Sequence, residues 1–298
     1  MKGLLLINKP EGITSFGAVA RIKRLAHERR VGHTGTLDPM ATGVLPVFLG
    51  RATALSSYLL EADKTYTARI RLGVTTDTCD ITGNVLEDKT AEILDKYSEY
   101  DIKKVLESFL GRGLQTPPMY SALKKNGVRL YDLARQGKTV EIEPREIEIF
   151  EISMISALEN NEFDINVRVS KGTYIRSLCR DIGEKLGCGA TLSKLCRTNA
   201  SGIDIKNCVN LDDLTEENIQ NFIMNEEKAV EHFKKVQVTE KQGIRFSNGG
   251  QLDLDRLGIK EAIDGELYRV RQGNNFLGLG VIEKEKNQLA IKCVINQM

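Results

Sequence analysis

The sequence has no tryptophan, only three histidines, at positions 27, 33 and 232, and six cysteines that never form a C-x-x-C pair. Zinc and related metal sites need closely spaced cysteine and histidine ligands, so this composition argues against a metal centre. Scattered cysteines of this kind are typical of reduced thiols in a cytosolic protein. We therefore expect no bound metal ion.

Long apolar runs are also absent. No segment approaches the roughly 20 apolar residues that cross a bilayer. The apolar N-terminal segment is too short for a signal peptide and lacks a small-residue cleavage site. We expect a cytoplasmic protein without a membrane partner. Its 298 residues, 41% of them apolar and 28% charged, are enough for one large domain and one small domain.

The formal net charge is only +1, but the charges are unevenly distributed. Residues 1–60 hold eight basic and three acidic side chains, and residues 164–200 hold seven and three. Residues 201–235 reverse the balance, with four basic and eight acidic. Such a molecule can present a basic face to phosphates while it stays nearly neutral overall. Charge clusters are equally typical of an ordinary solvated surface.

Residues 32–43 read G-H-T-G-T-L-D-P-M-A-T-G. Gly35 permits a backbone conformation that a side chain resists. Pro39 restricts Asp38 to extended backbone and removes one backbone donor beside it. The stretch predicts a fixed loop that presents one carboxylate and leads into an apolar strand at 44–49. An Asp-Pro turn whose carboxylate only caps the local backbone explains the same residues.

A second dense stretch, S-K-G-T-Y-I-R-S-L, covers residues 170–178 and follows an alternating apolar pattern over 140–170. That alternation predicts strands. Tyr174 and Arg176 are two residues apart, so a continuing strand would place them on one face. A strand with a surface arginine is the alternative interpretation.

Both stretches resemble motifs of the TruB family of tRNA pseudouridine-55 synthases, in which a G-H-T-G-x-L-D-P-x-A-T-G segment carries the catalytic aspartate. The first match is nearly unbroken over twelve residues. Looser matches occur elsewhere in the chain, at N-K-P-x-G (8–12), K-x-Y (64–66) and T-D-T-x-D-x-x-G (76–83).

The resemblance implies catalytic roles for Asp38, Tyr66 and Arg176. Asp38 is the family's catalytic acid, and Arg176 pairs with it and keeps it ionised. Tyr66 stacks on the target base and is implicated in proton transfer. The resemblance also implies that Tyr174 lies in the active site and that Asp80 helps to organise this site. From the residues alone, Tyr66 is a core aromatic and Asp80 forms an Asx-turn.

Four further residues match family positions that contact the substrate. His33 resembles the histidine that takes up space in the T-loop when the base is flipped, and Leu195 resembles a leucine that packs against that base. Lys9 belongs to the opening motif and Lys171 to the second dense motif, and both are expected to bind substrate. Without the resemblance, a capped loop histidine is the simpler interpretation of His33.

The resemblance implies an α+β fold with a mixed, mainly antiparallel central sheet flanked by helices, the pseudouridine synthase fold, over residues 1–232. Residues 115–137 resemble the family's insertion that contacts the T-arm. The acidic stretch at 207–235 is a candidate connection between domains. Short strands with glycine turns over 236–298 resemble a PUA RNA-binding domain, a small β-barrel.

The function that the resemblance implies is isomerisation of uridine 55 in the T-loop of tRNA to pseudouridine, by base flipping and an aspartate-dependent rearrangement of the glycosidic bond. Uracil is both the leaving and the incoming group, so no cofactor is expected. We expect the tRNA T-arm as partner, no obligate protein partner, and a monomer. The sequence does not decide whether Asp38 attacks C1′ or first removes a proton from C2′.

Three alternatives stay open. The first is an RNA-binding or tRNA-folding module without turnover. The second is a guide-RNA-dependent relative that acts on other RNAs, and the third is a nucleoside hydrolase that uses the same acid.

Overall fold

The computed structural model describes residues 1–298 except 60–62, 94–95, 122, 126, 139 and 297–298. Within the described residues, ten strands form one large mixed sheet in the order β14-β1-β3-β12-β4-β11-β10-β7, with β2 beside β3 and β13 beside β12. These strands are β1 (Gly3–Lys9), β2 (Val31–His33), β3 (Thr42–Leu49), β4 (Lys64–Leu72), β7 (Gly111–Gln115), β10 (Arg145–Met154), β11 (Glu162–Val169), β12 (Ala190–Ala200), β13 (Ile203–Asp204) and β14 (Val209–Asn210).

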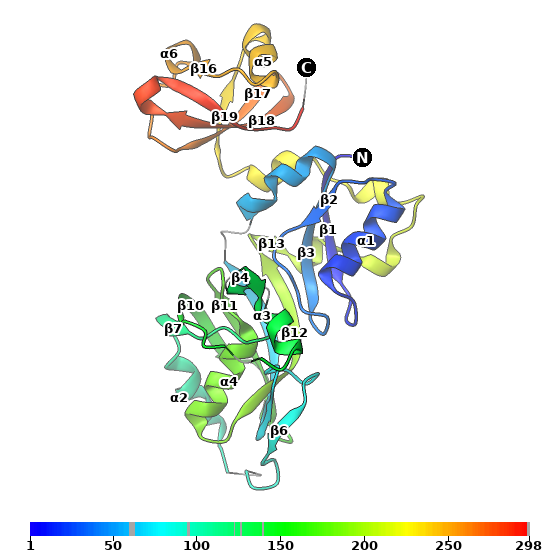
Figure 1. Ribbon diagram of the computed structural model, residues 1–298, viewed down its shortest axis with the longest axis vertical. Coiled ribbons are helices and arrows are strands. Elements are labelled where there is room, and N and C mark those ends of the chain that lie inside the picture. The colour runs from blue at the N-terminus through cyan, green and yellow to red at the C-terminus, as the bar shows by residue number, and fades with distance from the viewer. Residues whose placement is uncertain (60–62, 94–95, 122, 126, 139, 297–298) are drawn as a thin grey trace.

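Neighbouring strands of this sheet are antiparallel except at β1–β14 and β3–β12. The long strand β12 joins two groups of strands, β1–β3 on one side and β4, β11, β10 and β7 on the other (Figure 1). It pairs with β4 along most of its length but with β3 only through Cys196–Thr42 and Arg197–Gly43. The loop between β2 and β3, which carries Asp38, therefore lies at the junction of the two groups.

Helices cover this sheet. They are α1 (Ser15–Leu25), α2 (Glu99–Glu107), α3 (Leu130–Arg135), α4 (Ile175–Leu186) and the 3₁₀ helix η1 (Gly50–Leu59). The side chain of Thr14 caps α1 by accepting from the backbone N–H of Gly17. This is the N-cap arrangement that satisfies a free donor at a helix start. Two short hairpins complete this part of the chain, β5 (Val74–Thr76) with β6 (Val85–Asp88) and β8 (Lys124–Lys125) with β9 (Val128–Arg129).

The main core lies between the sheet and helices α1, α2 and α4. On β4 every second side chain is buried, from Tyr66 to Leu72, as the period of a half-buried strand requires. Leu178 and Ile182 of α4 belong to the same apolar cluster. The acidic stretch 207–235 contributes to the core as well, because Leu211 and Ile219 are fully buried in that cluster. Around strand β14 it forms short 3₁₀ helices: η2 (Ile205–Asn207), η3 (Leu211–Asp213), η4 (Ile219–Phe222) and η5 (Glu226–Val230).

The C-terminal unit is a five-stranded sheet in the order β15-β17-β18-β19-β16, with two helices. Its elements are β15 (Lys234–Gln237), α5 (Glu240–Ser247), β16 (Leu252–Asp253), α6 (Leu254–Leu257), β17 (Leu267–Gln272), β18 (Asn275–Glu283), η6 (Lys284–Lys286) and β19 (Gln288–Val294). Phe276 and Leu279 pack in one apolar cluster with Leu4 and Phe48, so the unit is seated on the edge of the larger part. These features confirm the expected α+β fold class.

None of the helices in the described part of the chain has the length and apolar character needed to span a bilayer.

Candidate active site

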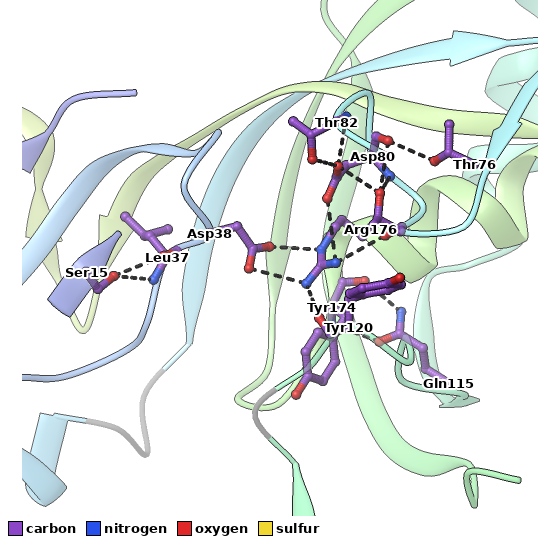
Figure 2. A network of polar contacts seen from close by, with 11 residues as sticks. Ser15, Leu37, Asp38, Thr76, Asp80, Thr82, Gln115, Tyr120, Tyr174 and Arg176 are labelled. Carbon is purple, nitrogen blue, oxygen red and sulfur yellow. Dashed lines mark hydrogen bonds and ion pairs between the residues drawn. The ribbon is translucent and has the colours of Figure 1, made fainter. Parts of the chain in front are cut away.

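Several hydrogen bonds hold the loop that carries Asp38. The hydroxyl of Ser15, in the first turn of α1, donates to the backbone carbonyl of Leu37 at 3.0 Å and accepts from the N–H of Leu37 at 2.9 Å (Figure 2). The N–H of Gly12 donates to the carbonyl of Pro39 at 2.9 Å. Gly35 has a φ of +68°, the left-handed conformation that its lack of a side chain permits. The residues on both sides of Asp38 are therefore held in place.

Arg197 of β12 lies beneath this loop and is 1% exposed. Its Nε donates to the carbonyl of Val44 at 2.8 Å and its Nη2 to the carbonyl of Gly35 at 2.6 Å. A side chain at Gly43 would place its Cβ 2.2 Å from the carbonyl oxygen of Arg197, so only glycine allows β3 to approach β12 here. One buried guanidinium thus binds the start of the loop and the strand that follows it.

Asp38 meets Arg176 across the junction of the two strand groups (Figure 2). The Nε of Arg176 lies 2.9 Å from Oδ2 of Asp38, and its Nη2 donates to Oδ1 at 3.3 Å. The side chain of Arg176 is 6% exposed and that of Asp38 36%. Paired N–H···O contacts of this kind fix the orientation of a carboxylate as well as its charge. One edge of the carboxylate is held while part of its surface stays accessible.

Asp80 supplies a second carboxylate to the same guanidinium, with Oδ2 3.6 Å from Nη1 of Arg176. Its other oxygen accepts from the hydroxyls of Thr78 and Thr82. Arg176 further donates to the carbonyls of Thr78 at 3.1 Å and Tyr120 at 2.9 Å. The structure therefore brings Asp38, Asp80 and Arg176 into one cluster.

The pKa of Asp38 is raised above its ordinary value. Burial is the largest cause, because the surrounding protein desolvates the charged form. Arg176 opposes the rise through its charge and its hydrogen bond, Lys9 opposes it through its charge, and the negative charge of Asp80 adds to it. Arg176 thus favours the ionised form, as expected, but burial outweighs it.

The prediction that Tyr174 and Arg176 share a strand face is wrong. Strand β11 ends at Val169, Gly172 turns with a φ of +81°, and Tyr174 is the N-cap residue of α4. Arg176 is therefore in the first turn of a helix. Gln115 fixes this helix start, since its side chain accepts from the N–H of Tyr174 and donates to the carbonyl of Tyr174.

The predicted insertion, 115–137, begins at the site instead of lying wholly on the surface; its residues 122 and 126 lie outside the described residues. Besides Gln115 and the carbonyl of Tyr120, the carbonyl of Thr116 accepts from the hydroxyl of Ser177 at 2.9 Å. The first part of the segment is therefore attached to α4.

Lys9 lies beneath the Asp38 loop and binds backbone carbonyls. It is fully buried, and its ammonium donates to the carbonyls of Pro10 at 2.7 Å, Ile13 at 2.8 Å and Pro39 at 3.3 Å. Burial lowers the pKa of Lys9 to about 8. These contacts tie Pro39 of the loop to the segment before α1, and a contact of Lys9 with substrate stays a prediction.

Tyr66 and Leu195 lie in the strands beside the loop. In the sheet register Arg197 pairs with Gly43 on one side and with Tyr66 on the other, which places Tyr66 two strands from the end of the Asp38 loop. Leu195 is 7% exposed and pairs with Ala68. Both side chains belong to the apolar cluster that also holds Leu37 of the loop.

His33 and Lys171 lie in the segments that precede Asp38 and Arg176 in the chain. His33 is in β2, five residues before Asp38, and its buried Nδ1 has no hydrogen-bond partner among the described residues. Burial, aided by the positive charge of Arg197, lowers the pKa of His33. Lys171 is exposed in the turn between β11 and α4.

Among the described residues, no group of three or more His, Cys, Asp or Glu side chains is arranged to hold a metal ion. Sequence reasoning did not single out Arg197. A signal was available, because Arg197 lies two positions after the buried Leu195 on an alternating strand, and an arginine on the buried face must bind something. Most arginines are exposed, so an arginine at a position expected to be buried is a recognisable exception.

Comparison with known proteins agrees with the arrangement. Residues 23–175 match the family model described as TruB family pseudouridylate synthase (N terminal domain), and residues 176–234 match the tRNA pseudouridylate synthase B C-terminal domain. A protein of Clostridium perfringens named tRNA pseudouridine synthase B is 47% identical over 281 residues, which cover 94% of this chain and 95% of the relative. One of the same name from Clostridium tetani is 44% identical over 286 residues, covering 96% and 97%.

Solved structures show the same fold. A chain of a Cbf5-Nop10-Gar1 complex superposes with a TM-score of 0.74 at 28% identity, covering 99% of this chain and 85% of that one. A chain of an H/ACA RNP bound to a substrate RNA gives 0.72 at 26% identity, covering 99% and 85%. Fold and sequence together define a pseudouridine synthase, an isomerase. The chain belongs to the TruB family, and its C-terminal unit is PUA-like.

Proposed function

We propose that this enzyme converts uridine 55 in the T-loop of tRNA to pseudouridine, with Asp38 as the reacting carboxylate. The observation that carries the proposal is the two-point contact of Arg176 with Asp38 at the junction of the strand groups. The names of the relatives, which specify tRNA, support the substrate class.

The reaction breaks the bond between N1 of uracil and C1′ of ribose and forms a bond between C5 and C1′. The proton on C5 is lost and N1 gains one, so atoms balance without a co-reactant. A carboxylate can attack an anomeric carbon, as retaining glycosidases do. Asp38 is the accessible acid of the cluster, and Arg176 holds it in a single orientation. Attack on C1′ and prior removal of a C2′ proton both use this carboxylate.

A uridine in a folded RNA loop reaches such a carboxylate only when it is flipped out of its stack, at a cost of a few kcal/mol. We assign Tyr66 to stacking on the flipped uracil and to proton transfer, and Leu195 to packing against it, because both lie in strands next to the loop. We assign His33 to the space that the flipped base leaves in the T-loop. Tyr174 and Asp80 shape the site, and Lys171 faces the RNA from the exposed turn before α4.

We further assign residues 1–232 to catalysis, with 115–137 contacting the T-arm, and residues 236–298 to RNA binding. The enzyme acts as a monomer without an obligate protein partner. The larger part contains the whole Asp38 cluster, while the C-terminal unit has an apolar cluster of its own.

The direct test incubates the full chain with an unmodified tRNA transcript and maps pseudouridine along it. We expect one modified position, 55, and no product when that uridine is replaced by cytidine. Product on an isolated T-arm stem-loop, without guide RNA or protein partners, excludes the guide-dependent alternative. Free uracil in place of pseudouridine would identify a hydrolase, and tight binding without product would leave an RNA-binding module.

A further inference from the structure

Phe16 is a large apolar side chain that the fold leaves in solvent, with 68% of its surface exposed. It is the second residue of α1 and follows Ser15, the residue whose hydroxyl makes both hydrogen bonds to Leu37. The first turn of α1 is therefore attached directly to the residue before Asp38. An exposed aromatic ring is fixed beside the site, and neither the predicted site residues nor the assignments above include it.

This ring packs against the ring of His33. The two ring centroids are 5.5 Å apart and the planes meet at 82°, an edge-to-face arrangement that aromatic pairs favour. The Nδ1 of His33 is buried, and no residue in the described part of the chain forms a hydrogen bond with it. Phe16 and His33 thus form a two-ring surface next to the Asp38 loop, and the side chain of Phe16 stays accessible because His33 occupies only part of it.

The surroundings fit a nucleic acid. Farther along α1, Lys23 and Arg24 are exposed, and Arg21 is partly exposed with an ion pair to Asp212 at 2.6 Å. An accessible aromatic face with neighbouring cations is the combination that binds unpaired nucleotides, because the ring stacks on a base while the cations attract the phosphates. A membrane or protein contact would need a larger apolar area than one ring.

We propose that Phe16 is a stacking platform for an unpaired base of the substrate RNA, next to the nucleotide that enters the Asp38 site. The inference rests on the proposed function for the identity of the RNA. It adds a binding residue that the TruB motifs do not contain, and it assigns His33 the further role of supporting the ring of Phe16.

The absence of tryptophan from the chain allows a direct test. The substitution Phe16→Trp introduces the protein's single indole, whose fluorescence is quenched when it stacks on a base. We expect quenching that saturates with added T-arm stem-loop RNA. The matched control is Tyr100→Trp, on α2 at a side chain that is 73% exposed, where we expect no quenching.

Binding measurements provide the second arm. One base–aromatic stack corresponds to about a 5- to 150-fold change in Kd, so Phe16→Ala should weaken binding of the stem-loop within that range. Phe16→Leu, which keeps an apolar side chain beside His33 without a ring, should weaken it nearly as much, and Phe16→Tyr should restore it. If Phe16→Leu binds like wild type, the ring only supports His33 and the proposal is overturned.

Unquenched indole emission at saturating RNA would also overturn it. Failure of the proposed function is a separate outcome, since it shows as absence of pseudouridine from the wild-type protein. The fluorescence and binding arms need no turnover and report on Phe16 in either case.

Discussion

Arg176 and Asp38 are 138 positions apart in the chain, yet the guanidinium of one holds the carboxylate of the other through contacts of 2.9 and 3.3 Å. Arg176 comes from the first turn of α4, and Asp38 from the loop that leads into β3. The pair spans the junction at which the two groups of strands are joined by only two residue pairs. This contact orients the carboxylate that we assign to the reaction.

The first prediction concerns the pH dependence of activity. The charge of Asp80 raises the pKa of Asp38, so Asp80→Asn should lower that pKa. The reaction requires the carboxylate form, and activity is lost as pH falls through the pKa of Asp38. The acid limb of the pH–rate profile should therefore move to lower pH in Asp80→Asn, measured in single turnovers at saturating RNA.

Asp77→Asn is the control for this shift. Asp77 belongs to the same loop but accepts from the N–H and Nδ2 of Asn84, away from Arg176. The acid limb of the pH–rate profile of Asp77→Asn should coincide with that of the wild type. An acid limb in Asp80→Asn at higher pH would contradict the charge balance described for the cluster.

A second prediction uses Lys9. Its pKa is lowered from 10.5 to about 8 in the folded protein, mainly by burial. Between those values the unfolded chain binds more protons than the folded one, so this group makes stability rise with pH. At 1.36 kcal/mol per pKa unit, the 2.5-unit difference limits the effect to about 3 kcal/mol.

The measurement is chemical denaturation at pH 7.5 and pH 10 for the wild type and Lys9→Met. Other groups titrate in both proteins, so the difference between them isolates Lys9. The wild type should gain about 2 kcal/mol relative to the variant on going to the higher pH. An equal response of both proteins would show that Lys9 is not desolvated.

The sequence predicted most of the strands and helices that position the site. It did not predict the surroundings of every side chain in it. The apolar strand predicted at 44–49 and the strands predicted over 140–170 follow from local patterns, and the structure shows them as β3, β10 and β11. Whether a chain continues as a strand beyond Val169 depends on the turn at Gly172 and on Gln115, which is distant in sequence and binds the backbone of Tyr174. Local spacing alone could not include that contact.

The same limit explains Lys9 and Phe16. A lysine next to a proline is normally exposed, and the three carbonyls that bury Lys9 converge only in the folded chain. Phe16 is the opposite case: an apolar residue near a helix start is normally packed, but this ring is exposed. Whether a cation is buried or an aromatic ring is exposed depends on the tertiary structure. Lys9 and Phe16 show both cases beside the Asp38 loop.

The third prediction concerns Arg197. Arg197→Met removes the guanidinium that binds the carbonyls of Gly35 and Val44, which should lower the free energy of unfolding by about 1–3 kcal/mol. The control is Arg69→Met, which removes a half-exposed ion pair with Asp164 and should cost about 1 kcal/mol or less.

A second measurement on Arg197→Met separates positioning from simple destabilisation. The positive charge of Arg197 contributes to the lowered pKa of His33, so that pKa should rise in the variant. The protein has only three histidines, so NMR titration can follow each ring. An unchanged pKa at His33 would show that Arg197 does not act on the loop electrostatically.

The central claim is that the carboxylate of Asp38 carries out the isomerisation. Its most direct test is Asp38→Asn in single turnovers with saturating unmodified tRNA, alongside a binding measurement on the same tRNA. We predict retained binding and a rate of pseudouridine formation at least about 10⁴-fold below wild type, the order of loss when an enzyme's nucleophile is removed. Pseudouridine formed at position 55 at the wild-type rate would contradict the account.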